Sequence, residues 1–316
     1  MIEGMNITFR QLQIFEAVAE QLSYTRAAEK LYLSQPAVSM QIKQLEEEVS
    51  IPLFERMGKR LFLTEAGEEL LNYAKNISQQ LIELDDVFDE MRGSEKGRLT
   101  IAVATTANYF ALKLLGEFYK RFSGTNINLD VTNRESLLKH LSDNTVDMVI
   151  MGQPPEGIEV ESTAFLENPL VVVAPKDHVL VGQKNISLSV LQQETFIMRE
   201  RGSGTRIAME RFFEQSGYSI SSVMEMSSNE AINQAVEAGL GLGIVSFHTL
   251  ELELALGRLA VLDVESFPIM RHWYLVHRQG KRFTALMEAF KRLVVDDAKL
   301  IVGPSATLPD QNQLPT

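Results

Sequence analysis

The chain has 316 residues, of which 45% are hydrophobic and 23% charged, a composition typical of a globular protein with two or three domains. It contains no cysteine, which excludes disulfide bridges and thiolate metal sites. No apolar run is long enough to span a membrane, and the start has no signal-peptide pattern, whether Met1 or Met5 is the native start. We therefore expect a cytoplasmic protein without a membrane partner.

The net charge of −12 argues by itself against a nucleic-acid partner. The acidic excess is uneven, however, because residues 1–65 are nearly balanced whereas residues 66–92 are strongly acidic. The placement of individual charges, rather than their total, must therefore decide whether the N-terminal part can bind DNA.

Three short helices are predicted at the N-terminus. Apolar residues spaced three and four apart predict the first over 8–22. Ser23 and Ser34 are suited to cap a second and a third helix over 24–31 and about 35–49. The outer face of the third helix carries polar and cationic side chains near its N-terminus, which suits contact with major-groove base edges and with phosphate. The candidate DNA-contacting residues of this helix and its cap are Ser34, Gln35, Pro36, Ser39 and Lys43.

Two short apolar segments, 53–55 and 61–63, flank a basic turn that contains Gly58. This pattern predicts a β-hairpin wing whose cations neutralise DNA phosphates. The alternative is a generic three-helix unit with a solvated polar face, and the wing argues against it. The wing cations are Arg56, Lys59 and Arg60.

Several stretches of this part resemble, in register and without gaps, the DNA-binding signature of LysR-type transcriptional regulators. The family usually has glycine where this chain has Ser50. The resemblance implies a regulator of transcription, with RNA polymerase as a candidate partner. The matching stretches are Ala27-Ala28, Ser34-Gln35-Pro36-Ala37-Val38-Ser39, Leu45-Glu46, Pro52-Leu53-Phe54-Glu55-Arg56 and Leu63-Thr64-Glu65-Ala66-Gly67.

A long helix is predicted from Thr64 to about Arg92. Its apolar residues repeat every four and three positions, which forms a heptad seam, whereas its other face is acidic. Because so narrow a seam needs a partner helix, we expect a dimer, or a tetramer, on an inverted-repeat DNA site. The alternative is that the seam packs on its own domain. The seam residues are Leu70, Ala74, Ile77, Leu81, Leu84, Phe88 and Met91.

Beyond a predicted hinge over 93–97, strand and helix patterns alternate in two sets before the chain returns to the first set. The βαβαβ order of the first set implies a parallel sheet with helices on both faces. We therefore expect an all-α winged helix-turn-helix, a linker helix and an α/β two-lobed effector domain like that of periplasmic binding proteins. The expected boundaries are 1–65 (DNA-binding), 66–92 (linker), 93–302 (effector; lobe I about 98–166 and 268–302, lobe II about 167–267) and 303–316 (disordered tail).

Polar residues follow the predicted strands at the edge where such sheets bind ligands. Their hydroxyls, amides, glycines and cations suit an anion. In the alternatives, Thr105 and Asn108 only cap a helix, Arg134 pairs with a surface carboxylate, and the 202–204 glycines serve backbone geometry. The candidates are Thr105, Thr106, Asn108, Asn133, Arg134, Gln153, Pro154, Arg199, Arg201, Gly202, Ser203, Gly204, Thr205 and Asn229.

No catalytic or metal site is apparent in the sequence. The five histidines have no metal-ligand spacing, and no nucleophile–base pair stands out. The glycine-rich segment 239–243 lies between a helix and the following strand, whereas a dinucleotide fingerprint needs the strand first. We therefore expect no enzyme activity, no metal and no resident cofactor. The main rival is a binding or transport protein whose helical front end serves assembly only.

The effector part also resembles one branch of the LysR family, the regulators of Calvin-cycle genes, and the resemblance extends over nearly the whole chain except the tail. It implies activation of carbon-fixation genes in response to an anionic metabolite in the cleft. Ribulose bisphosphate, phosphoenolpyruvate and NADPH are the candidates that the resemblance implies. The matching stretches are 106–110, 133–135, 151–157, 167–175 and 202–206.

Overall fold

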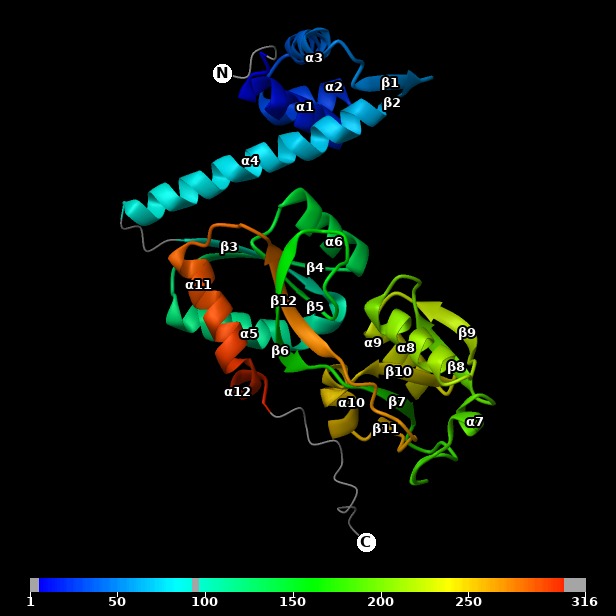
Figure 1. Cartoon of the computed structure of the whole chain (residues 1–316). Helices are drawn as coiled ribbons and strands as arrows, with labels where there is room; N and C mark the ends of the chain where they lie inside the picture. Colours follow the sequence, from blue (N-terminus) through cyan, green and yellow to red (C-terminus); the bar gives the residue numbers. More distant parts are fainter. Residues whose placement is uncertain (1–5, 93–96, 304–316) are drawn as a thin grey trace. The chain divides into compact units, whose positions relative to one another are not determined.

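The computed structural model describes residues 6–92 and 97–303 (Figure 1). They form two compact units, one made of the chain up to Phe88 together with Asp143–Thr145, the other of the remainder. Met1 and Met5, most of the predicted hinge and the tail beyond Gly303 lie outside the described residues. Within the described ranges, no helix is long and apolar enough to cross a membrane.

The first unit begins with α1 (Phe9–Gln21), α2 (Tyr24–Leu31) and α3 (Gln35–Val49). Each helix starts at a hydroxyl residue whose side-chain oxygen accepts a hydrogen bond from a backbone N–H of the first turn. Their apolar faces meet around Phe15, Val38 and Leu45, which are fully buried. The helix α3 ends at Ser50, whose φ of +57° is the left-handed conformation that glycine adopts most readily. The serine therefore keeps the turn geometry of the family's usual glycine.

The predicted wing and long helix follow. The strands β1 (Phe54–Met57) and β2 (Arg60–Leu63) pair antiparallel across a turn in which Gly58 has a φ of +64°. The helix α4 (Glu65–Met91) then runs for 27 residues, which corresponds to a length of about 40 Å.

Glu46 and Gly67 hold α3, the wing and α4 together. The Glu46 carboxylate accepts hydrogen bonds from the backbone N–H groups of Leu53 at 2.8 Å and Phe54 at 3.2 Å. A Cβ atom at Gly67 would stand 2.1 Å from the Leu53 carbonyl oxygen, so α4 can approach this loop only because residue 67 is glycine. The Thr64 hydroxyl accepts a hydrogen bond from the Gly67 N–H at 3.1 Å and caps α4.

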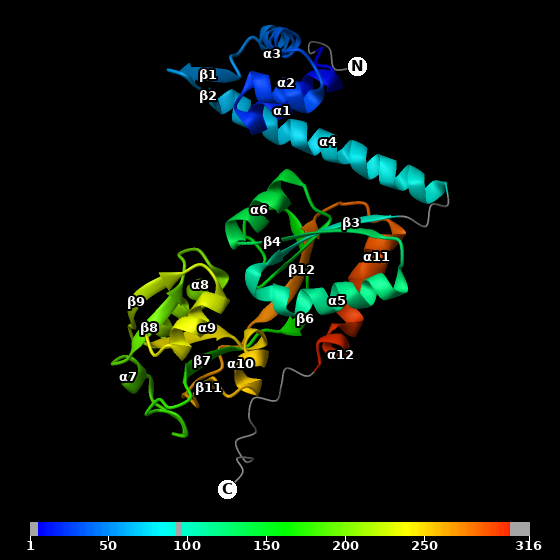
Figure 2. The same cartoon turned by 180° about the vertical axis from the view of Figure 1, so that it is seen from behind.

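Lobe I of the second unit contains a five-stranded sheet in the order β4-β3-β5-β12-β6, in which only β12 runs antiparallel to its neighbours. One face packs on Phe110 and Phe118 of α5 and on Phe290 of α11, and the opposite face packs on Leu137 and Leu141 of α6 (Figure 2). The elements are β3 (Arg98–Ala104), α5 (Asn108–Arg121), β4 (Asn126–Thr132), α6 (Arg134–Asp143), β5 (Met148–Met151), β6 (Val160–Glu167), β12 (His272–Arg278), α11 (Ala285–Arg292) and, after a π-helical turn, α12 (Ala298–Val302).

Lobe II contains a second five-stranded sheet in the order β11-β7-β10-β8-β9, in which only β7 runs antiparallel to its neighbours. The helix α8 packs on one face through Met209 and Phe213, and α9 packs on the other through Ile232 and Val236. The elements are β7 (Leu170–Pro175), α7 (Leu188–Leu191), β8 (Thr195–Arg199), α8 (Gly204–Gln215), β9 (Ser221–Met226), α9 (Asn229–Glu237), β10 (Leu242–Ser246), α10 (Glu251–Ala255) and β11 (Leu259–Val261).

The chain crosses between the lobes twice, from β6 into β7 and from β11 back into β12 (Figures 1 and 2). The strand that follows each crossing is the one antiparallel member of its sheet. The predicted two lobes, with helices on both faces of each sheet, are confirmed. The parallel pairing predicted for the first set of strands, β3, β4 and β5, is confirmed, whereas β6 and β11 are strands that the sequence does not predict.

Candidate DNA-binding surface and ligand pocket

The predicted base-contacting residues lie on the outer face of α3. Gln35, Pro36 and Lys43 are exposed, and Ser39 is half-buried. The Ser34 hydroxyl accepts a hydrogen bond from the N–H three residues further on, at 3.3 Å, so this side chain caps the helix. The first turn of a helix has N–H groups without intrahelical partners, and these attract a phosphate. The exposed start of α3 therefore combines polar side chains with a positive helix end.

The wing cations Arg56, Lys59 and Arg60 are all exposed. The Arg56 guanidinium lies over the Tyr24 ring of α2, 5.9 Å from its centroid, and this contact links the wing to the helical body. Lys59 occupies the turn, and Arg60 begins β2. The hairpin therefore presents three exposed cations, one on each strand and one in the turn, which suits contact with a phosphate backbone.

The predicted seam of α4 divides into two parts. Leu70 and Ala74 pack against the core of the first unit, where Ala74 is fully buried, so packing on the helix's own unit is correct for these two residues. The other five are between 39% and 72% exposed and form an apolar stripe along the rest of the helix. These five are Ile77, Leu81, Leu84, Phe88 and Met91.

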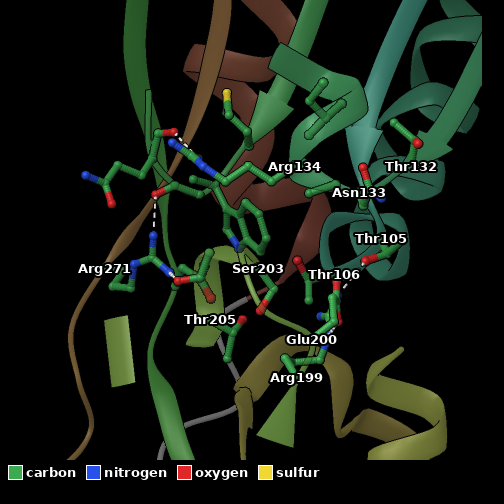
Figure 3. A pocket seen from close by; sticks show the side chains of 18 residues that line it. Thr105, Thr106, Thr132, Asn133, Arg134, Arg199, Glu200, Ser203, Thr205 and Arg271 are labelled. Carbon is green, nitrogen blue, oxygen red and sulfur yellow. Dashed lines mark hydrogen bonds and ion pairs between the residues drawn. The ribbon is translucent and has the colours of Figure 1, made fainter. Parts of the chain in front are cut away.

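A pocket with an empty volume of about 470 Å³, part of it open to solvent, lies between the two lobes of the second unit (Figure 3). Three helical segments start at its wall, at the ends of three strands. They are the 3₁₀ turn η1 (Thr105–Ala107) that leads into α5, the helix α6 and the helix α8. Helix N-termini carry partial positive charge, so this arrangement favours an anion.

Most of the predicted effector residues line this pocket. Asn108, Pro154, Arg201, Gly202 and Asn229 do not, although the Asn229 Oδ1 accepts a hydrogen bond at 3.1 Å from the guanidinium of a lining arginine. The predicted residues that line the pocket are Thr105, Thr106, Asn133, Arg134, Gln153, Arg199, Ser203, Gly204 and Thr205.

Arg134 and Arg271 bring two cations to the pocket. Arg134 donates to the Gln153 carbonyl at 2.7 Å, and Arg271 donates to the carbonyls of Gly204 at 2.7 Å and Gly152 at 3.2 Å. Neither guanidinium forms an ion pair with a carboxylate in the described part of the chain. Burial lowers the pKa of both groups, and the charge of Arg134 lowers the pKa of Arg271 further. A bound anion would relieve this repulsion.

Arg199 is already paired. Its Nε and Nη2 atoms donate to the two carboxylate oxygens of Glu200 at 2.7 and 2.8 Å. Nη2 also lies 3.4 Å from the hydroxyl of Thr105, which belongs to the other lobe. The residue that the sequence offers as a pocket cation is therefore neutralised by its neighbour in the chain.

The local contacts decide between the alternatives left open by the sequence. Neither η1 nor α5 has a side-chain cap hydrogen bond, so Thr105 and Asn108 do not cap these segments. Arg134 bonds a backbone carbonyl rather than a surface carboxylate. Gly202 has a φ of +84° with open space where a Cβ would stand, so backbone conformation alone accounts for this glycine.

Sequence reasoning did not select five polar or aromatic residues that line the pocket. Trp273 is the only tryptophan of the chain, is 1% exposed and packs against Phe110 with ring centroids 5.3 Å apart. Arg271 and Trp273 follow the second crossing, where no motif marks them. Glu200 is the single acidic residue in the basic stretch 199–206, and this contrast was the one signal in the sequence that could have marked it as a pocket residue. The five residues are Thr132, Asn168, Glu200, Arg271 and Trp273.

Residues 9–68 match the family model "Bacterial regulatory helix-turn-helix protein, lysR family", and residues 92–299 match the model "LysR substrate binding domain". Together these matches extend over both units of the structure. The chain belongs to the LysR family of bacterial transcription regulators. This confirms the predicted family, and it confirms the prediction of a regulator rather than an enzyme.

Two curated relatives and one solved structure show which members of this family the chain is similar to. The chain is 55% identical to a RuBisCO operon transcriptional regulator of Allochromatium vinosum, over 93% of this chain and 97% of that protein. It is 45% identical to the transcriptional regulator CbbR of Rhodospirillum rubrum, over 89% and 93% of the two chains. The regulatory domain of Synechocystis PCC6803 CcmR, in complex with 2-PG, is 42% identical with a TM-score of 0.62, over 64% of this chain and 97% of that domain.

Proposed function

We propose that this LysR-type regulator activates carbon-fixation genes when a phosphorylated anion binds between its lobes. The ligand part is carried by Arg134 and Arg271, two pocket guanidinium groups that have no carboxylate partner among the described residues. Similarity to regulators of the RuBisCO operon supports the target genes. The complex of the CcmR domain with 2-PG supports a small phosphorylated ligand. In this proposal residues 1–65 bind DNA, 66–92 pair two chains and 93–302 bind the ligand.

The pocket residues suit a phosphate group held between the lobes. Arg134 and Arg271 supply charge, and the hydroxyls of Thr106, Ser203 and Thr205 lie on the pocket wall (Figure 3). Ligand binding changes DNA binding only if the ligand prefers one arrangement of the lobes over another. Arg271 donates hydrogen bonds to carbonyls of both lobes, so an anion bound to its guanidinium would influence how the two lobes are arranged.

In the first unit, α3 would enter the major groove of DNA. Gln35, Ser39 and Lys43 lie on its outer face, where polar and cationic side chains reach base edges or flanking phosphates. Pro36 in the first turn leaves no helical hydrogen bond unmade. The wing cations then hold the phosphate backbone, which positions α3 without reading sequence.

Retardation of the DNA upstream of the regulated operon tests this function. The full-length protein is mixed with that DNA at fixed salt, alone or with 2-phosphoglycolate, ribulose bisphosphate, phosphoenolpyruvate or NADPH. We expect specific retardation that one phosphorylated metabolite strengthens, weakens or changes in mobility. If none of the metabolites changed the retardation, the ligand proposal would be wrong. Absence of retardation at low salt would remove the DNA proposal.

We propose that the exposed stripe on α4 pairs with the same stripe of a second chain. Five apolar side chains in water along one helix are covered well by an identical helix, and pairing presents two copies of α3 to two half-sites. Replacing Leu84 by Asp should yield monomers in sedimentation and abolish specific retardation. Replacing Leu112, an exposed leucine on α5, by Asp is the matched control and should leave the dimer intact. If the L84D protein were still a dimer, α4 would not form the dimer interface.

A further inference from the structure

Met40 is an apolar side chain on the face of α3 that is otherwise polar. An α-helix turns by about 100° per residue, so Met40 shares a face with Pro36, four residues before it, and Lys43, three residues after it. Val38 and Ile42, which belong to the buried stripe of the helix, lie on the opposite side. Met40 is 54% exposed and lies outside the hydrophobic core that the described residues of the first unit form. The packing of this unit therefore does not account for a methionine at this position.

Exposed apolar side chains of the first unit gather on the elements assigned to DNA contact. Among the described residues before α4, the three most exposed large apolar side chains are Tyr32 at 97%, Met57 at 62% and Met40 at 54%. Tyr32 lies in the turn before α3, Met57 ends the first strand of the wing, and Met40 lies on α3 itself. A single exposed apolar residue is ordinary on a protein surface, whereas several on the elements that approach one partner favour a role in contacting that partner.

The charges along α3 show which part of the helix approaches DNA. Gln35 and Ser39 lie near the N-terminus, where free N–H groups attract phosphate. Beyond Lys43 the outer face becomes acidic, and the exposed Glu47 carboxylate lies 3.6 Å from the Lys43 ammonium. DNA therefore meets the first two turns of α3, which include Met40. Because an α-helix fills a major groove about 12 Å wide, long side chains on this face reach the base edges.

The chemistry of a methionine side chain limits what it recognises on a base edge. A thioether has no N–H or O–H to donate and is only a weak acceptor, so it does not suit the polar groups of the bases. The one apolar group that base pairs present in the major groove is the C5-methyl group of thymine. The unbranched methionine side chain is flexible enough to pack against such a group.

We infer that Met40 is a specificity-determining residue, which recognises a thymine in each half-site by packing its thioether end against the 5-methyl group of that base. This inference rests on the DNA-binding role proposed above for α3. Ser39 and Lys43 lie beside Met40 and supply the polar contacts. Met40 supplies the apolar contact, which distinguishes thymine from the other three bases.

Deoxyuridine in place of thymidine tests this contact, because uracil is thymine without the 5-methyl group. The full-length protein is titrated at fixed salt with the duplex that it specifically retards, and with duplexes in which each thymine of one half-site is replaced in turn. At one position we expect the affinity to fall about 4-fold, or about 0.8 kcal/mol, as for one buried methylene group. Met40→Ala should bind the thymine duplex at least about 4-fold more weakly than the wild type, and the same uracil should not weaken it further.

Met40→Leu and Met57→Ala are the matched variants. Leucine has a helix propensity like that of methionine and keeps an apolar end, so Met40→Leu should still bind the thymine duplex more tightly than the uracil duplex. Met57→Ala removes a similarly exposed methionine from the wing, which positions α3 without reading sequence. Its ratio of affinities for the two duplexes should equal that of the wild type.

The outcomes are separable. If the wild type retards no DNA specifically, the proposed DNA-binding function fails, and the inference with it. If the wild type retards DNA specifically but no uracil substitution weakens binding, only the inference is overturned. It is also overturned if Met40→Ala, with its fold intact by circular dichroism, loses the same factor as the wild type at that position. Another residue, or the shape of the DNA, would then sense the methyl group.

Discussion

The DNA-binding unit and the ligand pocket are assembled by contacts of different range. In the DNA-binding unit, the residues in contact, Glu46, Leu53 and Gly67, all belong to one short stretch of the chain. In the pocket, Arg134 and Arg271 come from segments separated by most of the effector domain. Local assembly leaves a contiguous motif in the sequence, whereas distant assembly leaves single residues with nothing around them to indicate a site.

The largest expected effect tests the local assembly. Replacing Gly67 by Ala places a Cβ atom 2.1 Å from a backbone oxygen that is part of a short loop, so α4 and the wing must separate. We expect a destabilisation of the first unit by about 3 kcal/mol or more and loss of DNA retardation. Anion binding, followed through Trp273 in the second unit, should persist.

Gly116→Ala is the matched control for this prediction. Gly116 also lies within a helix, but a Cβ there would meet no atom of the described residues within 4 Å. Alanine should leave retardation intact and stabilise the helix by about 0.5–1 kcal/mol. If Gly67→Ala bound DNA as well as Gly116→Ala does, the close approach at residue 67 would not be what holds the unit together.

The same contrast explains how much of the molecule could be predicted from the sequence. The wing and α4 were predicted because caps, glycines and apolar periodicity act within a few residues of one another. Most of the strands and helices of both lobes were also predictable, although β6 and β11 were not, and so was the polar edge that includes Arg134. Arg271 was not, because it enters the pocket only after the chain crosses back from lobe II, and a sequence does not show where a returning strand inserts.

Glu200 and the α4 seam show a second limit. Local spacing places Arg199 at the pocket but does not reveal that the adjacent acid turns back to pair with it. Heptad spacing likewise predicts seven seam residues but does not reveal that Leu70 and Ala74 are covered by the core of their own unit. In both cases the pattern gives a residue's position, and the tertiary contacts decide its role.

The second prediction addresses the distant assembly. Replacing Arg134 by Gln removes one of two pocket cations, and a hydrogen bond to a charged group contributes about 1.5–3 kcal/mol. We therefore expect the affinity for a phosphorylated ligand to fall about 10- to 100-fold, measured by calorimetry. Retardation without ligand should not change. Arg201→Gln removes an exposed cation of lobe II that does not line the pocket, so it serves as the control and should bind as the wild type does.

The third prediction separates phosphate contact from base contact in the DNA-binding unit. Replacing Lys59 by Ala removes a wing cation, so affinity should fall similarly for all DNA sequences, and the slope of log affinity against log salt should decrease by about 1. Lys30→Ala removes an exposed cation of α2 that pairs with Glu20, and it should change the slope less. Weakening at the specific site alone would instead place Lys59 among the base-reading residues.

The smallest expected effect concerns pH and belongs to the second unit only. His248 lies beside Phe110, with ring centroids 5.5 Å apart, and its Nε2 atom is 2.8 Å from the Glu167 carbonyl. Burial lowers the pKa of His248, and the charge of Lys113 lowers it further, whereas the backbone hydrogen bond partly opposes this. The folded protein therefore keeps this ring neutral at a pH where the unfolded chain already takes up a proton.

Because the unfolded state binds that proton first, the folded state loses stability as the pH falls below about 6.5, the usual histidine value, until the lowered pKa is reached. Above that range His248 contributes no pH dependence. Urea unfolding followed by Trp273 fluorescence at pH 7.5 and 5.5 should show a smaller difference in the His248→Gln protein than in the wild type. Part of the difference should remain, because burial also lowers the pKa of His277. If the difference between the two pH values were the same in both proteins, His248 would not be a source of the acid sensitivity. If His248→Gln also changed the retardation of DNA, the second unit would influence the DNA-binding unit even in the absence of ligand.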